Sequence, residues 1–458
     1  MSAELEKLDF GDPRRSARGL LVAERLAHQP KASMPAAMRG EAELEGAYRH
    51  LTSPAVTLGN VVAPHVDKTR QRVREAGVAY AVHDTTDFTF GGEAEREGLG
   101  PVQGGDQGFL AHLSLAVSAE GQRIPLGLLA VGTRVRGGAG GSRDNERDKW
   151  ALGMAHASQG LAADSLIHVA DREADVYEVV SWLRQESQRF IIRAAQDRVV
   201  LEQVEPEEKN HLFAAAQQAP AQMEVDVQLG PRAHKGRAAK DVKRHPVRRV
   251  RKARLAYSAT CIRLSRPAKA SKKLPAHQSI NVVRAWEVQP PKGQEPVEWI
   301  LLTSEPIDTP QQVQKVVEGY RTRWCIEEYI QAVKTGCAYE ESQLESAHGL
   351  FNLLGYCLIV AYALLLMRAQ SRAREPLPAE HFFSPAQLAC LRAFSRKSLP
   401  SNPSVQEALL ACAALGGHLR RNGLPGWRTM STGYSRLLDY EQGFLAAQRL
   451  RGSTSDQS

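Results

Sequence analysis

Short apolar segments separated by turn residues occupy the chain between residues 74 and 195. Five of them predict strands: VAYAVHDTT (78–86), GFLAHLSLAV (108–117), RIPLGLLAVG (123–132), SLIHVAD (165–171) and RFIIRAA (189–195). The second and third are joined by a turn at Glu120 and Gly121. Helical segments precede and follow the fourth, so this part of the chain predicts a mixed sheet that begins as a meander.

The region from about 196 to 310 has a more regular alternation of apolar and polar positions. It predicts antiparallel strands at MEVDVQL, ARLAYSATCIRL, INVVRAWEV and EWILLTSEP. A very basic connection, Arg232–Lys273, lies among them. A three-stranded meander followed by two helix-linked strands is the order of a ribonuclease-H-like sheet. We therefore expect an α/β fold: a ribonuclease-H-like mixed sheet with an antiparallel β insertion, flanked by N- and C-terminal helical domains.

Helical patterns occupy both ends of the chain. Near the N-terminus, Asp12 is a candidate N-cap and Pro13 fits the first helical position; a second helix is expected around EAELEGAYRHL. The apolar run Leu353–Met367, interrupted by Gly355, predicts a buried helix and not a membrane span. The expected domains are 1–58 (helical, DNA-end-binding), 59–370 (catalytic, with the β insertion at about 196–310) and 371–458 (helical, dimerisation).

The last predicted helix carries an apolar face whose partner the sequence leaves open. The face consists of Leu437, Tyr440, Phe444 and Ala447. It can pack on the rest of this chain or on a second protomer, and the sequence favours neither.

The net charge and the spacing of the cysteines restrict the classes of function that fit this chain. The 458 residues carry a net charge of +8, with a pI near 9.2, which favours a polyanionic partner. The six cysteines form no CxxC pair and no zinc-binding spacing. They predict reduced thiols in a cytoplasmic protein.

The stretch YRTRWCIEEYIQAVK, residues 320–334, contains no Gly or Pro and predicts a helix of about four turns. On such a helix, one stripe about 60° wide would hold Tyr320, Arg323, Glu327 and Lys334. A carboxylate flanked by two cations and a phenol suits a surface that faces phosphates. The alternative is a solvated helix face with ion pairs between residues four apart.

Two aspartates lie where predicted strands end. Asp84 ends the first strand and Asp171 the fourth, and ligand sites gather at the carboxyl ends of strands in such sheets. Together with Glu327 they would supply three carboxylates, which suit hard ions: Mg²⁺, with Mn²⁺ as a substitute. Two such ions would activate a water or a 3′-hydroxyl for phosphoryl transfer. The alternative for each aspartate alone is a turn or a helix cap.

Three blocks resemble the catalytic motifs of the DDE transposases: HDTTDFTF, ADREADVYEV and the Y-x2-R-x3-E-x6-K pattern of residues 320–334. The similarity is greatest to the hairpin-forming, cut-and-paste insertion-sequence family. Further segments occur in that family's order along nearly the whole chain: GDPRRSAR, EGAYR, NERDKW, PPKG, WILLTSEP and GFLAA. The signature at 320–334 and the DREAD block are the most specific of these.

The resemblance assigns roles to individual residues. It implies that the metal ligands are Asp84, Asp171 and Glu327, with the helical stripe selecting Glu327 over Glu328. Residues implied to hold the terminal phosphates and the distorted DNA end are Tyr320, Arg323 and Lys334. Trp299 matches an aromatic that stacks on a flipped base, with Trp324 assisting; a core position is the alternative for both tryptophans. Positions implied to contact DNA are Arg14, Arg15, Arg18 and Arg49 at the N-terminus and Arg193 in the catalytic domain.

The implied function is cut-and-paste DNA transposition, with nicking, hairpin formation, hairpin resolution and strand transfer at the transposon ends. The expected partners are double-stranded DNA and a second protomer in the paired-end complex, without a membrane. One alternative is a catalytically silent regulator or repressor that binds the ends. Another is a structure-selective nuclease of the same fold, which would leave Trp299 and the C-terminal helices without a role.

Overall fold

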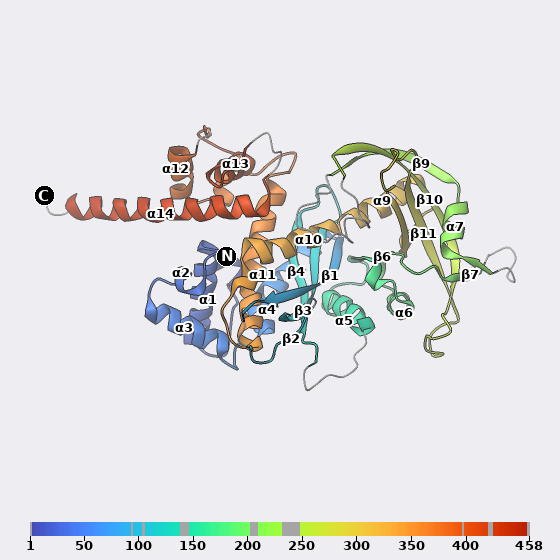
Figure 1. Cartoon of the computed structure of the whole chain (residues 1–458), viewed down its shortest axis with the longest axis horizontal. Helices are drawn as coiled ribbons and strands as arrows, with labels where there is room; N and C mark the ends of the chain where they lie inside the picture. Colours follow the sequence, from blue (N-terminus) through green and yellow to red (C-terminus); the bar gives the residue numbers. More distant parts are fainter. Residues whose placement is uncertain are drawn as a thin grey trace. The chain divides into compact units, whose positions relative to one another are not determined.

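The computed structural model describes residues 2–92, 95–102, 106–137, 146–201, 209–230, 248–395, 398–419 and 425–455. The chain forms two compact units (Figure 1). The first comprises Met1–Ala79, Asp84–Arg143 and Trp324–Ser458, and the second Tyr80–His83 and Asp144–Arg323. The boundaries of these units differ from those of the three domains expected from the sequence. The three-domain organisation stays a prediction.

The first unit contains the beginning of the sheet. Its strands are β1 (Ala79–Phe90), β2 (Gly100–Pro101), β3 (Gln107–Ser118) and β4 (Pro125–Arg134). β3 lies between β1 and β4 and pairs antiparallel with β2 and β4, as the predicted meander requires. The prediction that the first strand ends at Asp84 is wrong, because β1 continues to Phe90. Phe88 and Phe90 are buried beside Tyr339, so alternating burial extends the strand beyond Asp84.

Helices surround these strands. They are η1 (Ser2–Leu5), α1 (Pro13–His28), α2 (Met34–Ala37), α3 (Glu41–Thr52), α4 (Leu58–Ala76), η4 (Tyr339–Glu341) and α11 (Ala347–Gln370). Asp12 caps α1 as predicted, since its side chain accepts from the Arg14 and Arg15 amides. α11 is long and apolar enough to cross a membrane, but 78% of its most apolar window is buried. It packs on α1, α3, α4 and β4, as a core helix does.

The C-terminal helices share a core of their own. They are η5 (Ala379–His381), α12 (Pro385–Phe394), α13 (Val405–Leu415) and α14 (Trp427–Ser455). Leu437 is fully buried in this core and Tyr440 stacks on Phe394, with ring centroids 4.4 Å apart. Phe444, further along α14, is 37% exposed. The predicted apolar face is therefore covered within the chain over its first half and open over its second.

The second unit continues the sheet. Its first elements are α5 (Glu146–Ser158), β5 (Leu166–Ala170), η2 (Arg172–Ala174), α6 (Tyr177–Gln185) and β6 (Arg189–Arg193). β5 follows the first half of β1 in the sheet and pairs parallel with β6. This is the order expected from the sequence.

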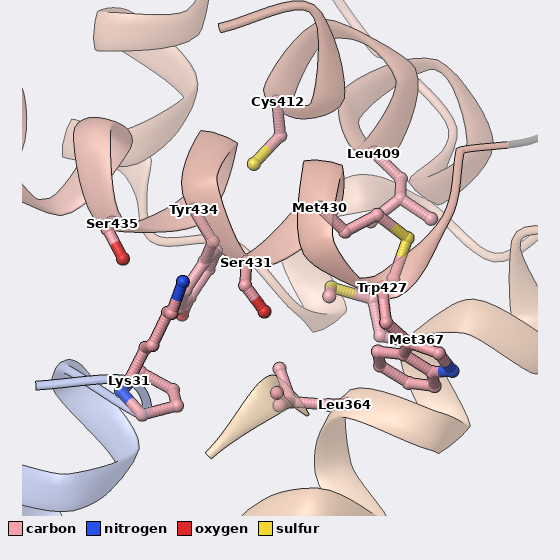
Figure 2. Close-up of a pocket in the computed structure, with 12 residues that line it drawn as sticks. Lys31, Leu364, Met367, Leu409, Cys412, Trp427, Met430, Ser431, Tyr434 and Ser435 are labelled. Atoms are coloured by element: carbon pink, nitrogen blue, oxygen red, sulfur yellow. The ribbon is translucent and has the colours of Figure 1, made fainter. Parts of the chain in front are cut away.

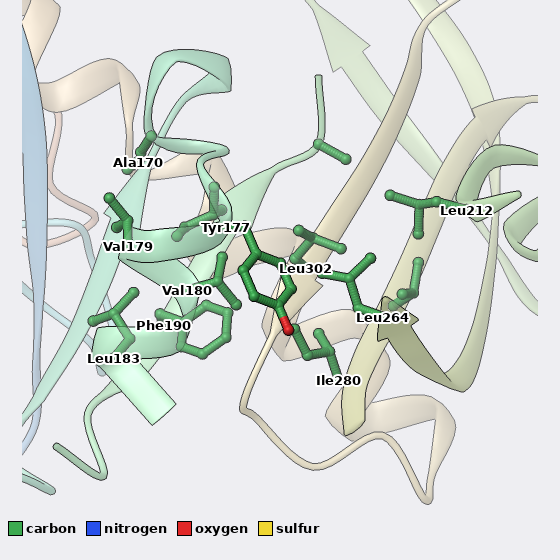
Figure 3. Close-up of a cluster of buried hydrophobic side chains, with 14 of the residues drawn as sticks. Ala170, Tyr177, Val179, Val180, Leu183, Phe190, Leu212, Leu264, Ile280 and Leu302 are labelled. Carbon is green, nitrogen blue, oxygen red and sulfur yellow. The ribbon is translucent and has the colours of Figure 1, made fainter. Parts of the chain in front are cut away.

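The β insertion follows β6. Its elements are β7 (Val199–Leu201), β8 (Lys209–His211), α7 (Leu212–Gln218), β9 (Ala221–Leu229), β10 (Arg251–Ser265), β11 (His277–Glu287) and β12 (Glu298–Thr303). β9, β10, β11 and β12 pair antiparallel in turn, and β12 pairs antiparallel with β6. Figure 3 shows part of the cluster of buried side chains that covers one face, including Tyr177, Phe190 and Leu302. The expected fold class, a mixed α/β sheet with an antiparallel addition and helices at both ends, is confirmed.

The predicted continuous helix at 320–334 is wrong. The chain forms α9 (Pro310–Arg321), a turn, α10 (Trp324–Gln331) and the π-helical turn η3 (Ala332–Gly336). The break occurs because Thr322 competes for helical hydrogen bonds: its hydroxyl donates to the Gly319 carbonyl at 2.6 Å. The Thr322 and Arg323 amides also bond to carbonyls three residues back. The expected polar stripe, which assumed 100° per residue throughout, is therefore not formed.

Candidate active site

Asp84 lies in the interior of strand β1 in the first unit. Its Oδ1 accepts a hydrogen bond from the Thr85 amide at 2.8 Å. The Thr85 hydroxyl lies 3.0 Å from Nδ1 of His112, a buried residue of β3. Two paired strands thus hold Asp84, which gives its carboxylate a rigid support.

Two adjacent glutamates lie in the first turns of α10, also in the first unit. Glu328 pairs with Arg372 at 3.0 Å and with Arg368 at 3.8 Å. Glu328 is therefore committed to an ion-pair cluster at the end of α11. The choice of Glu327 over its neighbour as the metal ligand stays a prediction.

Lys334, on the π-helical turn, contacts the strand that carries Asp84. Its ammonium group donates to the Asp87 carbonyl, pairs with Glu340 at 3.1 Å and lies 5.3 Å from the centre of the Phe88 ring. Glu340 also accepts from the Thr89 amide at 2.9 Å. Lys334 thus joins the second half of β1 to the segment that follows Glu327, in addition to any contact with phosphate.

Asp171 follows β5 directly, as predicted, and belongs to the second unit. Its Oδ1 accepts from the Glu173 amide at 2.9 Å and so caps the short helix η2. The capping role, which was the simpler alternative, is therefore present. The side chain is only half-buried, and a carboxylate that caps with one oxygen keeps further lone pairs for a ligand.

A group of polar side chains surrounds Tyr320 in the second unit. A Cβ at Gly319 would lie 2.7 Å from Ile191 Cδ1, so this glycine allows α9 to approach β6 closely. Tyr320 follows and interacts electrostatically with Arg193 at the end of β6. Burial raises the pKa of the Tyr320 hydroxyl, and Asp171 raises it further, while Arg193 and Arg323 lower it. Tyr320, Arg193, Arg323 and Asp171 therefore share one electrostatic environment.

The two candidate tryptophans differ in their surroundings. The Trp299 ring packs edge-on against Tyr320, with centroids 5.3 Å apart, and is half-buried. Trp324 is 62% exposed. Neither is a core residue, so the alternative reading of both tryptophans as core residues is wrong. Trp299 lies beside the Tyr320 group.

The four N-terminal arginines lie on α1 and α3. Arg14 and Arg49 are exposed, whereas Arg15 donates to the Phe10 carbonyl at 2.9 Å and Arg18 lies against Gly46 of α3. Burial, with smaller contributions from Arg18 and Arg15, lowers the pKa of the neighbouring His50 to about 4. The positive potential of this surface therefore comes from arginines at neutral pH, with His50 uncharged.

Comparison with known proteins identifies the family of the chain. A family model described as the transposase DNA-binding domain matches residues 1–56, and a model described as the transposase DDE domain matches residues 153–364. The chain belongs to the DDE transposases. The DDE match includes Asp171, Tyr320 and Glu327, while Asp84 precedes it. DNA is therefore a partner of this transposase, and nuclease or strand-transfer activity is the activity of its family.

One solved structure, a cryo-EM structure of the piggyBac transposase synaptic complex with hairpin DNA, is distantly similar. It shares 10% sequence identity over 96% of this transposase and 75% of the other chain, with a TM-score of 0.39. This similarity is too remote to support a conclusion about fold or mechanism.

DDE domains generally use divalent metal ions. Among the residues that the structure describes, no three His, Cys, Asp or Glu side chains gather as a ready metal site. The predicted ligands of this transposase are divided between the units, with Asp84 and Glu327 in the first and Asp171 in the second. All three are half-buried carboxylates, and this donor set fits a hard cation such as Mg²⁺.

Asp175, the second aspartate of the DREAD block, is a supporting residue that the sequence analysis missed. Its side chain is buried and accepts from the Ala195 and Gln196 amides, at 2.6 and 2.8 Å, and from Arg198. It fixes the chain directly after Arg193. Because the DREAD block was assigned to metal binding, its pattern did not indicate this structural role of Asp175.

We expect Asp175→Ala to destabilise the transposase by about 3–5 kcal/mol, because it removes the carboxylate that pairs with the covered Arg198 side chain and accepts from two part-buried amides. Glu173→Ala is the matched control from the same block: Glu173 forms only a surface pair with Lys149, worth less than about 1 kcal/mol. Urea unfolding of the two variants measures the difference. Equal stabilities would show that Asp175 does not support this loop.

Proposed function

We propose that this transposase moves its element by a cut-and-paste route through a hairpin. Water would first cleave one strand at the transposon end and leave a free 3′-hydroxyl. That hydroxyl would attack the opposite strand and close a hairpin, and a second hydrolysis would open it to a blunt end. The 3′-hydroxyl would then join the target DNA. The association of Tyr320, Arg193 and Arg323 around Asp171 is the observation that most favours phosphoryl transfer here.

Three carboxylates would hold the metal: Asp84, Asp171 and Glu327. When bound, Mg²⁺ (or Mn²⁺) would activate the attacking oxygen and stabilise the leaving one. The paired strands β1 and β3 would keep Asp84 in a fixed orientation. The contacts of Lys334 with Asp87 and Glu340 would do the same for Glu327. Rigid support of this kind lowers the cost of arranging charged groups during reaction.

The group around Tyr320 would hold the phosphates next to the scissile bond. Arg193 donates to the Glu298 carbonyl at 3.1 Å, which aligns its guanidinium along β12. Burial lowers the pKa of Arg193, although an arginine remains charged at neutral pH. A neutral Tyr320 hydroxyl can donate to a phosphate oxygen in the same place, since burial keeps it protonated.

Trp299 would receive the base that leaves the helix when the hairpin closes. Stacking of a base on an aromatic side chain contributes about 1–3 kcal/mol. Trp299→Ala is therefore expected to slow hairpin formation about 5- to 150-fold and to leave first-strand nicking within about twofold. A denaturing gel separates nicked, hairpin and blunt products.

Two further variants serve as controls for Trp299→Ala. Trp299→Phe keeps a stacking ring and should retain most hairpin formation. Trp286→Ala, on the adjacent strand β11, removes a tryptophan that stacks under Arg284 and should not change the nick-to-hairpin ratio. Equal losses at every step in Trp299→Ala would show that Trp299 only supports packing.

We further propose that two protomers hold two transposon ends together and act in the cytoplasm. The N-terminal arginines would bind the end sequence, and the exposed part of α14 would contact the second protomer. The alternative, a silent end-binding repressor, predicts binding without cleavage. Incubation of the intact protein with its own end DNA and Mg²⁺ decides between them, because a repressor yields no nicked product.

A further inference from the structure

The helix that carries Glu327 is joined to the C-terminal helices by a cluster around Glu328. Glu328 contacts Arg372 through both of its oxygens, at 3.0 and 3.1 Å, and Arg368 at 3.8 Å. Its side chain is only 20% exposed. Arg372 lies on the exposed side of this cluster, whereas the Arg368 side chain is covered, so the Arg368 contact is the one shielded from water.

Arg368 continues the cluster to α14. Its guanidinium carbon lies 4.7 Å from the centre of the Trp427 ring, and its Nη1 lies 4.0 Å from the Met430 sulfur. The Arg368 side chain is 12% exposed, and burial lowers its pKa to about 10. This buried cation needs the negative charge of Glu328, which raises the Arg368 pKa.

A second contact joins α14 to the π-helical turn after α10. The Ser431 hydroxyl donates to the Thr335 carbonyl at 3.5 Å, and a Cβ at Gly336 would lie 3.9 Å from the Trp427 ring. Figure 2 shows Trp427 and Met430 beside Met367 and Leu364 of α11, around a small pocket. The first turns of α14 therefore contact both the end of α11 and the segment that follows Glu327.

We propose that Glu328 is a positioning residue that ties the helix carrying Glu327 to the end of α11 through Arg368 and Arg372, and through Arg368 to α14. This inference rests on the proposed function, since it assigns Glu327 to the metal. Placement of Glu327 then depends on the C-terminal helices. These include α14, whose exposed end would contact a second protomer.

The first test is Glu328→Gln, which keeps the shape of the side chain and removes its charge. Cleavage of end DNA should fall about 10- to 100-fold, the range typical when a residue that orients metal ligands is replaced. Binding of end DNA should stay within about twofold, because the N-terminal arginines are unchanged. The control is Arg374→Gln, an exposed arginine two positions beyond Arg372, which should cleave normally. Normal cleavage by Glu328→Gln would overturn the proposal.

The double variant Glu328→Gln/Arg368→Met separates positioning from stability. It removes both charges, so no buried cation is left unpaired, and methionine can still pack on Trp427. The melting temperature should return toward that of the original protein, while cleavage stays as low as in Glu328→Gln. Recovery of cleavage together with the melting temperature would mean that Glu328 acts only through stability, against the proposal.

Amide hydrogen exchange, measured without DNA, tests whether Glu328 holds α10 in place. Amides of α10 and of the π-helical turn should exchange about tenfold faster in Glu328→Gln and in the double variant, but not in Arg374→Gln. Unchanged exchange would overturn the tie even if cleavage fell. If the intact protein cleaved no DNA at all, the proposed function would fail, and faster exchange in Glu328→Gln would still support the tie.

Discussion

Replacement of Asp171 by alanine is expected to abolish Mg²⁺-dependent cleavage of the transposon ends, and so are Asp84→Ala and Glu327→Ala. Each change removes one of three carboxylates that would hold the metal, and metal stabilisation of transferring charge is worth several kcal/mol. The rate should therefore fall by at least about 1,000-fold. End binding should persist, because the arginines of α1 and α3 supply most phosphate contacts in the proposed complex.

The measurement combines a gel shift with a cleavage assay on the same end DNA. Asp171 also caps η2, so Asp171→Asn, which keeps an oxygen for the Glu173 amide, guards against local unfolding. Glu341→Ala is a control carboxylate elsewhere in the first unit. Cleavage that survives in Glu327→Ala would show that a different carboxylate completes the triad.

The sequence predicted the strands well because alternating burial is a local property. β3, β4, β5 and β6 and the four main strands of the insertion all lie where short apolar segments indicated. The end of β1 was misjudged, since Asp84 and its threonines resemble a strand end. Phe88 and Phe90 continue the strand and are covered by Phe109 of β3 and by Tyr339, some 250 residues later. A contact of that range cannot be read from a local pattern.

The break between α9 and α10 shows a second limit of predicting structure from the sequence. Propensity supported a continuous helix, whereas the Thr322 hydroxyl bonds to the Gly319 carbonyl at the break, where α9 also approaches β6 closely. The assignment of candidate residues does not depend on this helix, because it rests on the motif spacing, and it stays a prediction. What the sequence could not give was the use of Lys334 and Asp175 as supports. Their partners are backbone groups of β1 and of the loop after β6.

Removal of residues 442–458 is expected to abolish the paired-end complex and double-strand cleavage while leaving single-end binding intact. The structure fixes where this cut should be made. Leu437 and Leu438 belong to the buried part of α14, and Glu441 accepts from Ser384 and Gln387 at 2.5 and 2.9 Å. A cut before Leu437 would therefore disrupt the C-terminal core, whereas a cut after Glu441 preserves it.

Beyond Glu441 the helix exposes apolar side chains, with Phe444 37% and Leu450 70% exposed. Exposed apolar groups on a helix commonly mark a protein contact, and a closed two-fold pair is the commonest arrangement of identical protomers. Light scattering with end DNA should show one protomer per end for the truncated chain and two protomers with two ends for the intact chain. Phe444→Ser should weaken pairing, whereas Gln442→Ser, at an exposed polar position of the same helix, should not. If the truncated chain still pairs two ends, the protomers meet through another surface, and the open end of α14 has a different role.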